Sequence, residues 1–431
     1  MSIYYTITTL GCKVNQSESE SLAASLKSRG MSEAGSATAD VCIINTCTVT
    51  QKASMQSRQA IRRSIRLNPQ ARIIVTGCYA QMQPEQIRRI DKVDDIIGHR
   101  AKMRIPDLIN TEVANEDTSA ALELPFCNIE ALPADFSRTR PVLKIQDGCN
   151  TFCTYCIVPY ARGRSRSMPV KDVSDAVNAV HSSGKHEIVL AGIHLGCYGQ
   201  ELTPSTSLVE LLNYVLSDTS IERIRLSSIE PAELTSDIIT LASESERLCS
   251  HFHIPLQSGD DSILERMHRP YTRSMFSSLI RQIHAVMPDA AIGADTLAGF
   301  PGETEAAFEN TFTLVEELPI SYLHVFPFSA RKGTPAYTFP DKVADNVIKA
   351  RCRRLRELGK RKKNEFYQKF IHQKIEILVE SQRDRKTGLL KGFTSNYIPV
   401  LVQAGDELKN KLVMVRIERI DGNETAFGSI L

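Results

Sequence analysis

The sequence predicts an α/β protein in three parts: a doubly wound parallel sheet over residues 1–115, a partial (βα)6 barrel over residues 135–366, and a small β-barrel over residues 369–431. In the first two parts, short apolar runs alternate with helical stretches, and many of the runs turn polar or glycine-rich where they end. In the last part, strand-like runs follow one another without helical stretches between them.

In the first part, apolar runs end at cysteines. "YYTITTLGC" leads to Cys12, "VCIINTC" to Cys47 and "RIIVTGC" to Cys78, and a helical stretch follows each run. Parallel strands present their carboxyl ends at one sheet edge, where open α/β sheets bind ligands. We therefore expect these three thiols, here named the sheet trio, to converge in space. Cys42 lies inside a run and is expected in the core.

The second part contains six candidate strands, in "VLKIQDG", "EIVLAGIHLG", "RIRLSSIEP", "HFHIPLQSG", "AIGADTLAGFPG" and "YLHVFPFSARKGTPA". An apolar start and a polar end are typical of (βα) units whose chemistry lies on the C-terminal loops. Residues 116–138, which precede these units, show weak periodicity and are interpreted as a linker or an inserted excursion.

The last part contains the runs "KIEILVE", "LLKGFTSNYIPVLVQA" and "KLVMVRIERIDGNETAFGSIL". Within the last run, Asp421-Gly422 is a hairpin turn signal. These features indicate a small β-barrel module.

Charge and cysteine content limit the classes of function. The formal net charge is only +2, so a nucleic-acid surface requires local clustering of basic residues. The N-terminus does not resemble a secretory signal, and no run approaches the ~18 apolar residues of a membrane span. We therefore expect a cytoplasmic protein with reduced thiols. There, clustered cysteines indicate metal binding or catalysis rather than disulfides.

Three further cysteines share one short loop, "DGCNTFCTYC". Cys149, Cys153 and Cys156, here named the barrel trio, have the spacing C-x-x-x-C-x-x-C. A closed structural zinc site has four ligands, whereas three thiolates on a [4Fe–4S] cluster leave one iron open. The spacing favours such a cluster; an incomplete zinc knuckle or plain buried thiols are the alternatives.

The barrel trio, with Tyr155 before its third cysteine and a (βα) pattern behind it, resembles the radical S-adenosylmethionine (SAM) superfamily. The resemblance implies that the open iron chelates SAM and that reductive cleavage yields a 5′-deoxyadenosyl radical. It also implies that the cofactor site includes Tyr155, Gly192, Gly196, Ser228, Glu230, His253, Gln257 and Asp295. The alternatives are turn glycines and a core histidine with satisfied hydrogen bonds.

The motifs "TLGCKVNQSES", "INTCTVTQKASMQSRQAIRR" and "VTGCYAQ" resemble the methylthiotransferases, and the resemblance covers nearly the whole chain. It implies that the sheet trio holds a second [4Fe–4S] cluster carrying the sulfur that is methylated and transferred; three unrelated buried thiols are the alternative. The phrases "TLGCKVNQSES" and "GFTSNYIPV" look most like the branch that acts at C2 of N6-threonylcarbamoyladenosine in tRNA, and the tail resembles the RNA-binding TRAM module. We expect no ligand role for Cys127, Cys197, Cys249 and Cys352.

Basic and aromatic residues fit a tRNA partner. The candidate RNA contacts are Arg162, Arg164, Arg166, Arg353, Arg354, Lys362 and Lys363, with Phe393 and Tyr397 as stacking platforms for bases. Solvated helix faces and core packing are the alternatives for these residues.

Three other functions remain open at this stage. A methylthiotransferase can act on a ribosomal-protein aspartate or on isopentenyladenosine of tRNA. A non-enzymatic iron–sulfur protein that binds RNA or transfers electrons is the alternative from another class. The sequence does not identify the reductant protein or the sulfur donor.

Overall fold

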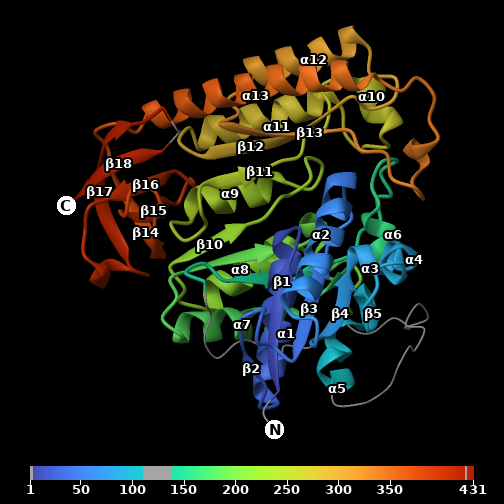
Figure 1. The fold of residues 1–431 in the computed structure, drawn as a ribbon. Coiled ribbons are helices and arrows are strands. Elements are labelled where there is room, and N and C mark those ends of the chain that lie inside the picture. Colours follow the sequence, from blue (N-terminus) through green and yellow to red (C-terminus); the bar gives the residue numbers. More distant parts are fainter. Residues whose placement is uncertain (1–2, 110–137, 423–424) are drawn as a thin grey trace.

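The computed structural model describes residues 3–109, 138–422 and 425–431. It confirms an α/β fold with an N-terminal parallel sheet, a central barrel and a closed C-terminal barrel. Figure 1 shows the N-terminal sheet and the C-terminal barrel on different sides of the central barrel. The expected linker at 116–138 lies outside the described residues except for Arg138, and the domain limits at 115 and 135 fall there too, so these limits stay predictions.

The N-terminal sheet has five parallel strands in the order β2–β1–β3–β4–β5. Their bounds are β1 Tyr4–Thr9, β2 Ser32–Glu33, β3 Val41–Thr46, β4 Arg72–Gly77 and β5 Asp95–Gly98. The chain places β2 on one side of β1 and then β3, β4 and β5 on the other, so the strand order reverses between β1 and β3. Open α/β sheets bind ligands at such a switch point. Cys12 follows β1 and Cys47 follows β3, so these two cysteines flank the switch point.

Helices cover both faces of this sheet because its strands are apolar on both sides. Ile43 of β3 packs with Leu22 and Leu26 on one face, and Cys42 packs with Ile61 on the other. The helices are α1 Lys13–Ser28, α2 Gln51–Leu67, α3 Cys78–Met82, α4 Pro84–Arg88, η1 His99–Arg104 and α5 Ile105–Ile109. The predicted core position of Cys42 is confirmed, since its side chain is buried.

The central barrel contains the six predicted parallel strands in two hydrogen-bonded groups, β10–β9–β6 and β11–β12–β13. They span β6 Val142–Lys144, β9 Glu187–Ala191, β10 Arg223–Leu226, β11 His251–His253, β12 Ala291–Ala298 and β13 Tyr322–Pro327. The covering helices are α7 Val170–Ser182, α8 Leu208–Asp218, α9 Ser236–Glu244, α10 Asp261–Arg266, α11 Arg273–Val286, α12 Glu305–Glu317 and α13 Asp345–Gln368. A bridge between Ile224 and Leu248 links the two groups.

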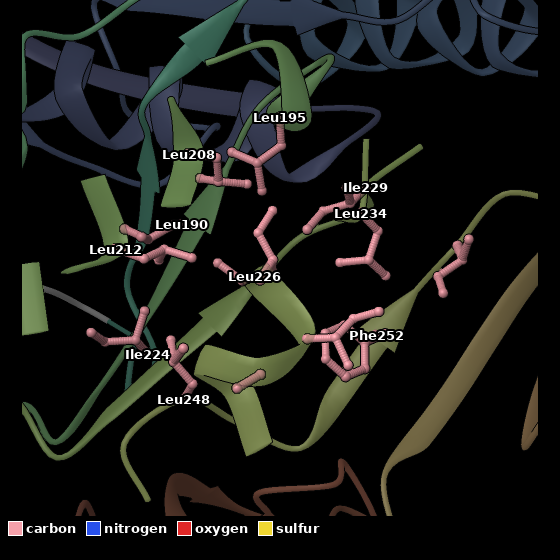
Figure 2. Packing of buried hydrophobic residues seen from close by; sticks show 14 of the residues in the cluster. Leu190, Leu195, Leu208, Leu212, Ile224, Leu226, Ile229, Leu234, Leu248 and Phe252 are labelled. Atoms are coloured by element: carbon pink, nitrogen blue, oxygen red, sulfur yellow. The ribbon is translucent and has the colours of Figure 1, made fainter. Parts of the chain in front are cut away.

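Alternation along the barrel strands separates an apolar outer face from a polar inner face. Leu190 of β9 and Ile224 of β10 pack with Leu212 of α8 in the main apolar core (Figure 2). Successive side chains of a strand point to opposite faces. Glu187 and Arg225 therefore lie on the inner face, where their side chains are buried against each other at 2.7 Å. Polar and charged side chains therefore line the interior of this barrel.

The tail forms a closed five-stranded barrel in the order β14–β15–β16–β18–β17. Its strands are β14 Lys374–Arg383, β15 Leu390–Thr394, β16 Pro399–Val402, β17 Leu412–Ile420 and β18 Ala426–Ile430. The expected hairpin is confirmed by the antiparallel pairing of β17 and β18, although residues 423–424 of its turn are not described. Arg225 of the central barrel donates to the Ser395 carbonyl at 2.8 Å, so the loop after β15 closes over the central barrel. Within the described ranges, no helix combines the length and the apolar character needed to cross a bilayer.

Candidate active site

The barrel trio lies on the loop that follows β7 (Gln146–Asp147) and ends at α6 (Val158–Arg162). Its thiols are free, and two of them contact cationic or hydrogen-bonding side chains. The Cys149 Sγ lies 3.4 Å from His194 Nδ1, and the Cys153 Sγ accepts a 3.3 Å hydrogen bond from Arg269. Burial, together with Cys153 as a neighbouring thiol, raises the pKa of Cys156 to about 12. Ligation of a metal by this thiol therefore releases a proton.

A second layer of side chains surrounds the barrel trio. His194, which contacts Cys149, also lies 2.6 Å from Glu233 through its Nε2. Arg269, which contacts Cys153, forms an ion pair with Glu230. The sequence predicted Glu230 but not His194, Glu233 or Arg269, because these residues stand on separate loops that only the fold brings to the trio.

The sheet trio occupies the carboxyl edge of the N-terminal sheet. Cys12 is the N-cap of α1, Cys47 directly follows β3, and Cys78 opens α3 directly after β4. A methyl group built on Gly11 would lie 3.0 Å from the Cys47 Sγ, so the loops of Cys12 and Cys47 are in contact. Burial, with smaller contributions from thiolates at Cys78 and Cys12, raises the pKa of Cys47 to about 11. The structure therefore brings the three thiols together.

The two trios belong to elements that pack against each other. Helix α3 begins at Cys78, and it packs against α6, which begins two residues after Cys156. The last residue of α6 is Arg162, whose side chain enters the interface between the two domains. The two cysteine sites are therefore joined by direct packing of two short helices.

Arg162 is the centre of a buried network of charges in this interface. Its guanidinium donates to Glu18 at 3.0 Å, to Asp147 at 2.8 Å and to the Asn15 side chain at 2.5 Å. Lys102 adds a 2.5 Å contact to Glu18. Despite burial, the neighbouring cations hold the pKa of Glu18 and of Asp147 well below their ordinary values. Both carboxylates are thus ionised and paired.

Comparison with known proteins identifies the family. The profile described as "Uncharacterized protein family UPF0004" matches residues 4–98, and that of the radical SAM superfamily matches residues 143–315. The chain is 38% identical to threonylcarbamoyladenosine tRNA methylthiotransferase MtaB of Bacillus subtilis, over 95% of this chain and 92% of that protein. The chain belongs to the radical SAM methylthiotransferases.

Other relatives carry two different substrate names. The MtaB protein of Rickettsia prowazekii is 37% identical, over 91% of this chain and 90% of that protein. A tRNA-2-methylthio-N(6)-dimethylallyladenosine synthase of Clostridium tetani is 34% identical, over 96% of this chain and 93% of the relative. Among solved structures, the radical SAM methyltransferase TsrM of Kitasatospora setae superimposes with a TM-score of 0.59 at 14% identity, over 78% of this chain and 77% of that one. This last likeness shows the fold alone.

The cofactors of this methylthiotransferase family are SAM and [4Fe–4S] clusters, and the residues present fit them. Each trio supplies three free thiols from neighbouring backbone segments, which is the donor set of a cluster with one open iron. In the described residues the two sets come from different domains, so they form two sites. The assignment of individual ligands is a proposal taken up below.

Most of the other expected cofactor residues lie on strands of the central barrel or on the loops that follow them, and Tyr155 lies on the loop of the barrel trio. Gly192 follows β9, Gly196 lies in η3 (Leu195–Cys197), and Ser228 is exposed after β10. His253 donates from Nε2 to the Asp295 carboxylate at 2.8 Å. Two more expected residues complete this set: Gln257 and Tyr155. Gln257 bridges to Thr296 of β12, and the Tyr155 ring packs edge-on to Phe300.

The prediction of a surface role was wrong for two basic residues. Arg162 is only 1% exposed, because Glu18 and Asp147 draw it into the interface. Lys362 is buried and donates to the Glu316 carbonyl at 2.8 Å. Five candidate RNA contacts keep an exposed or partly exposed side chain: Arg164, Arg166, Arg353, Arg354 and Lys363. Of these, Arg354 pairs with Glu309 and Arg166 with Asp147.

Phe393 and Tyr397 form a stacked pair with ring centroids 5.2 Å apart. The Arg140 guanidinium lies 4.2 Å from the Phe393 centroid, and that of Arg225 lies 4.7 Å from the Tyr397 centroid. Both rings are partly buried and line a cavity of about 810 Å³, together with Lys13 of α1. The aromatic pair therefore belongs to a basic groove between the three parts of the molecule.

The polar inner face of the barrel adds residues that the sequence analysis missed. The His251 Nε2 lies 2.7 Å from the Tyr322 hydroxyl, and the His251 ring lies 4.9 Å from that of Tyr397. His324 of β13 lies 3.3 Å from Asp295. Strict alternation of polar residues in "HFH" and "YLH" was the available signal, since side chains two apart share a face.

Proposed function

We propose that this methylthiotransferase modifies tRNA, adding a methylthio group at C2 of N6-threonylcarbamoyladenosine next to the anticodon. Support comes from the activity named for relatives that cover more than nine tenths of the chain. The observation that carries the proposal is the packing of α3 on α6, which sets the two cysteine trios at one domain interface. Transfer of sulfur to an unactivated C–H carbon needs a radical source and a sulfur source close together.

We assign the two clusters to the two trios. Cys149, Cys153 and Cys156 would hold the cluster that binds SAM, and the sheet trio would hold the cluster that carries sulfur. When bound, these groups supply a 5′-deoxyadenosyl radical, the transferred sulfur and the methyl group. The chain itself holds each ligand loop in place through the packing of α3 against α6.

Side chains around the barrel trio would orient the cofactor. Glu230 and Arg269 form one ion pair beside Cys153, and His194 and Glu233 form another beside Cys149. A Cβ atom at Gly196 would lie 2.3 Å from a Glu233 carboxylate oxygen, so this glycine leaves room for the His194–Glu233 pair, and Gly192 and Ser228 follow the neighbouring strands β9 and β10. Phe393, Tyr397 and the basic groove around them would contact the RNA.

A second candidate substrate is isopentenyladenosine in tRNA. It is favoured by relatives named tRNA-2-methylthio-N(6)-dimethylallyladenosine synthase, at 34% and 36% identity. The two substrates differ in charge, because the threonyl side chain carries a carboxylate and the dimethylallyl group is apolar. The polar and cationic inner face of the barrel favours the charged substrate.

Nucleoside mass spectrometry of tRNA tests the function directly. A host strain lacking its own enzyme is complemented with this chain or with its Cys149→Ala variant. We expect 2-methylthio-N6-threonylcarbamoyladenosine only with the unchanged chain. A methylthio group on isopentenyladenosine instead would replace the proposed substrate, and mass spectrometry of ribosomal proteins from the same strain tests the aspartate. The same strain reports on the proposed cytoplasmic location, because tRNA modification takes place there.

A further inference from the structure

We propose that Lys13 is the cation that binds the carboxylate of the substrate base and so selects the charged nucleoside over an apolar one. This inference rests on the proposed function, since it names the group that recognises its substrate. Lys13 is the first residue of α1 and directly follows Cys12 of the sheet trio. Its side chain lines the cavity that Phe393 and Tyr397 also line.

The position of Lys13 relates it to both the sulfur site and the barrel interior. Helix α1 packs beside β6, the edge strand of the barrel. Lys13 lies within electrostatic range of Tyr397, Arg225 and Arg140, which come from the C-terminal barrel, the central barrel and the segment before β6. The ammonium group therefore faces the chamber in which all three parts meet.

Three arginines at the junction of the central and C-terminal barrels already have carboxylate partners, and Arg385 and Lys386 of the cavity lining are exposed, whereas Lys13 is partly buried. Arg225 pairs with Glu187 at 2.7 Å, Arg140 with Glu380 at 2.7 Å, and Arg223 with Glu376 at 2.7 Å. Among the described residues, no carboxylate forms an ion pair with Lys13, and Glu187, which acts on it electrostatically, is itself paired with Arg225 at 2.7 Å. A partly buried ammonium without a carboxylate in direct contact is costly, and an incoming carboxylate lowers that cost.

The chemistry of the substrate matches this position. Its C2 and its carboxylate belong to one modified base, so both must fit in the same chamber. Cys12 belongs to the proposed sulfur site, and the next residue in the chain offers the positive charge. An ammonium–carboxylate hydrogen bond is charge-assisted, so its loss costs about 10- to 100-fold in binding. An apolar dimethylallyl group gains nothing from this ammonium and would have to desolvate it.

A phosphate of the tRNA backbone could supply the same kind of charge. A change to the substrate alone, with the protein unchanged, distinguishes the base carboxylate from a backbone phosphate. An anticodon stem-loop that carries the threonylcarbamoyl group as its methyl ester keeps every phosphate and loses only the base carboxylate. A phosphate partner would make Lys13 equally important for the acid and for the ester.

The test compares three proteins, each reconstituted with iron and sulfide: the wild type, Lys13→Met and Lys13→Arg. Equilibrium binding and kcat/KM are measured for the acid and the ester stem-loops. Lys52→Met, at an exposed lysine of α2, serves as the control for the loss of one positive charge elsewhere on the protein. We expect the wild type to prefer the acid about 10- to 100-fold, Lys13→Arg to keep most of this preference, and Lys13→Met to lose it. The ester should bind all variants alike.

Equal binding of acid and ester by the wild type overturns the inference, as does a parallel loss on both substrates in Lys13→Met. If the Met variant fails to retain iron, equal binding of acid and ester by the wild type still overturns the inference, and so does a loss of the preference in Lys13→Arg, which keeps the charge. Binding is read separately from turnover, so a failure of the proposed function stays distinguishable. An enzyme that prefers the acid through Lys13 but forms no thiomethyl product would keep this inference and refute the activity.

Discussion

The guanidinium of Arg162 lies 3.0 Å from the carboxylate of Glu18, and this contact joins the helix after the barrel trio to the helix after Cys12. Both side chains are buried, at 1% and 5% exposure, and Asp147 completes the pairing of the arginine. Removing one partner of a buried ion pair leaves an uncompensated charge.

Replacing Arg162 with Met should therefore lower the free energy of unfolding by about 3–5 kcal/mol, since Glu18 and Asp147 lose their shared cation. Urea unfolding followed by circular dichroism measures this change. Arg164→Met is the matched control, because Arg164 is exposed two residues further on and should change stability by less than about 0.5 kcal/mol. Equal stabilities of the two variants would contradict the importance of the network.

This arginine also shows where sequence reasoning ends. The sequence analysis placed Arg162 with Arg164 and Arg166 among the candidate RNA contacts, and only the fold shows that Arg162 enters an interface. Its partner Glu18 stands 144 residues earlier in the chain. No local pattern specifies such a distant pair, because the charge on each residue is compatible with an exposed position.

The fold itself was largely predictable. Apolar runs gave the strands of both α/β parts, since a parallel strand buried on both faces reads as a continuous apolar segment. The convergence of Cys12, Cys47 and Cys78 followed from their place at strand ends. His194 and Arg269 escaped prediction because each acts through a contact between loops.

His99 should make the stability of the protein depend on pH. Burial and the nearby Arg162 lower its pKa from 6.5 to about 4, so the folded protein keeps the imidazole neutral where the unfolded chain takes up a proton. The free energy of unfolding should fall as the pH drops from 6.5 towards 4, by about 3 kcal/mol in total. Glu18 and Asp147, with lowered pKa values, lose their contributions at still lower pH.

His99→Gln should reduce the slope of the profile between pH 6.5 and 4, because one of the residues that take up a proton on unfolding is gone. His251, whose pKa is also lowered by burial, keeps the remaining part of the slope. Thermal or urea unfolding at a series of pH values in both proteins measures the difference in slope. An unchanged slope in the variant would assign the pH dependence to other groups.

Gly77 should be essential for the sheet trio because it sets the position of Cys78. Its φ of +94° lies in the left-handed region, and a Cβ atom there would sit 2.4 Å from the Thr46 carbonyl oxygen. Gly77→Ala must therefore shift the turn that places Cys78. We expect loss of about half of the bound iron and of the thiomethyl product, with 5′-deoxyadenosine formation retained.

Gly30→Ala is the matched control for Gly77→Ala. Gly30 also has a positive φ, of +80°, but no atom lies within 4 Å of an added Cβ. Only the conformational cost of about 1–2 kcal/mol applies there. Iron content and product formation should stay at wild-type levels, and equal iron loss in both variants would show that strain alone, rather than the displacement of Cys78, is responsible.

Substitution of single cysteines should separate the two clusters. Cys149→Ala should abolish SAM cleavage, whereas Cys12→Ala should keep 5′-deoxyadenosine formation and lose the thiomethyl product, because each removes one of three thiolates from a different site. Iron and sulfide analysis should show one cluster lost in each variant. Cys42→Ala, at a core cysteine of the same sheet, should keep both clusters, and two full clusters in either ligand variant would refute the assignment.

The groove beside Phe393 and Tyr397 should bind the tRNA backbone electrostatically. Arg385 and Lys386 line it, and both side chains are exposed. Replacing both with Ala should weaken tRNA binding and reduce the slope of log K against log salt by about 0.7–0.9 for each phosphate that the protein no longer neutralises. Arg361→Ala is the control, since Arg361 lies on α13 and pairs with Glu316 at 2.5 Å. Because neutralising a phosphate releases counter-ions whatever the base sequence, the weakening should be the same for modified and unmodified tRNA. Weakening confined to modified tRNA would instead place these two residues at the base, inside the chamber that holds Lys13.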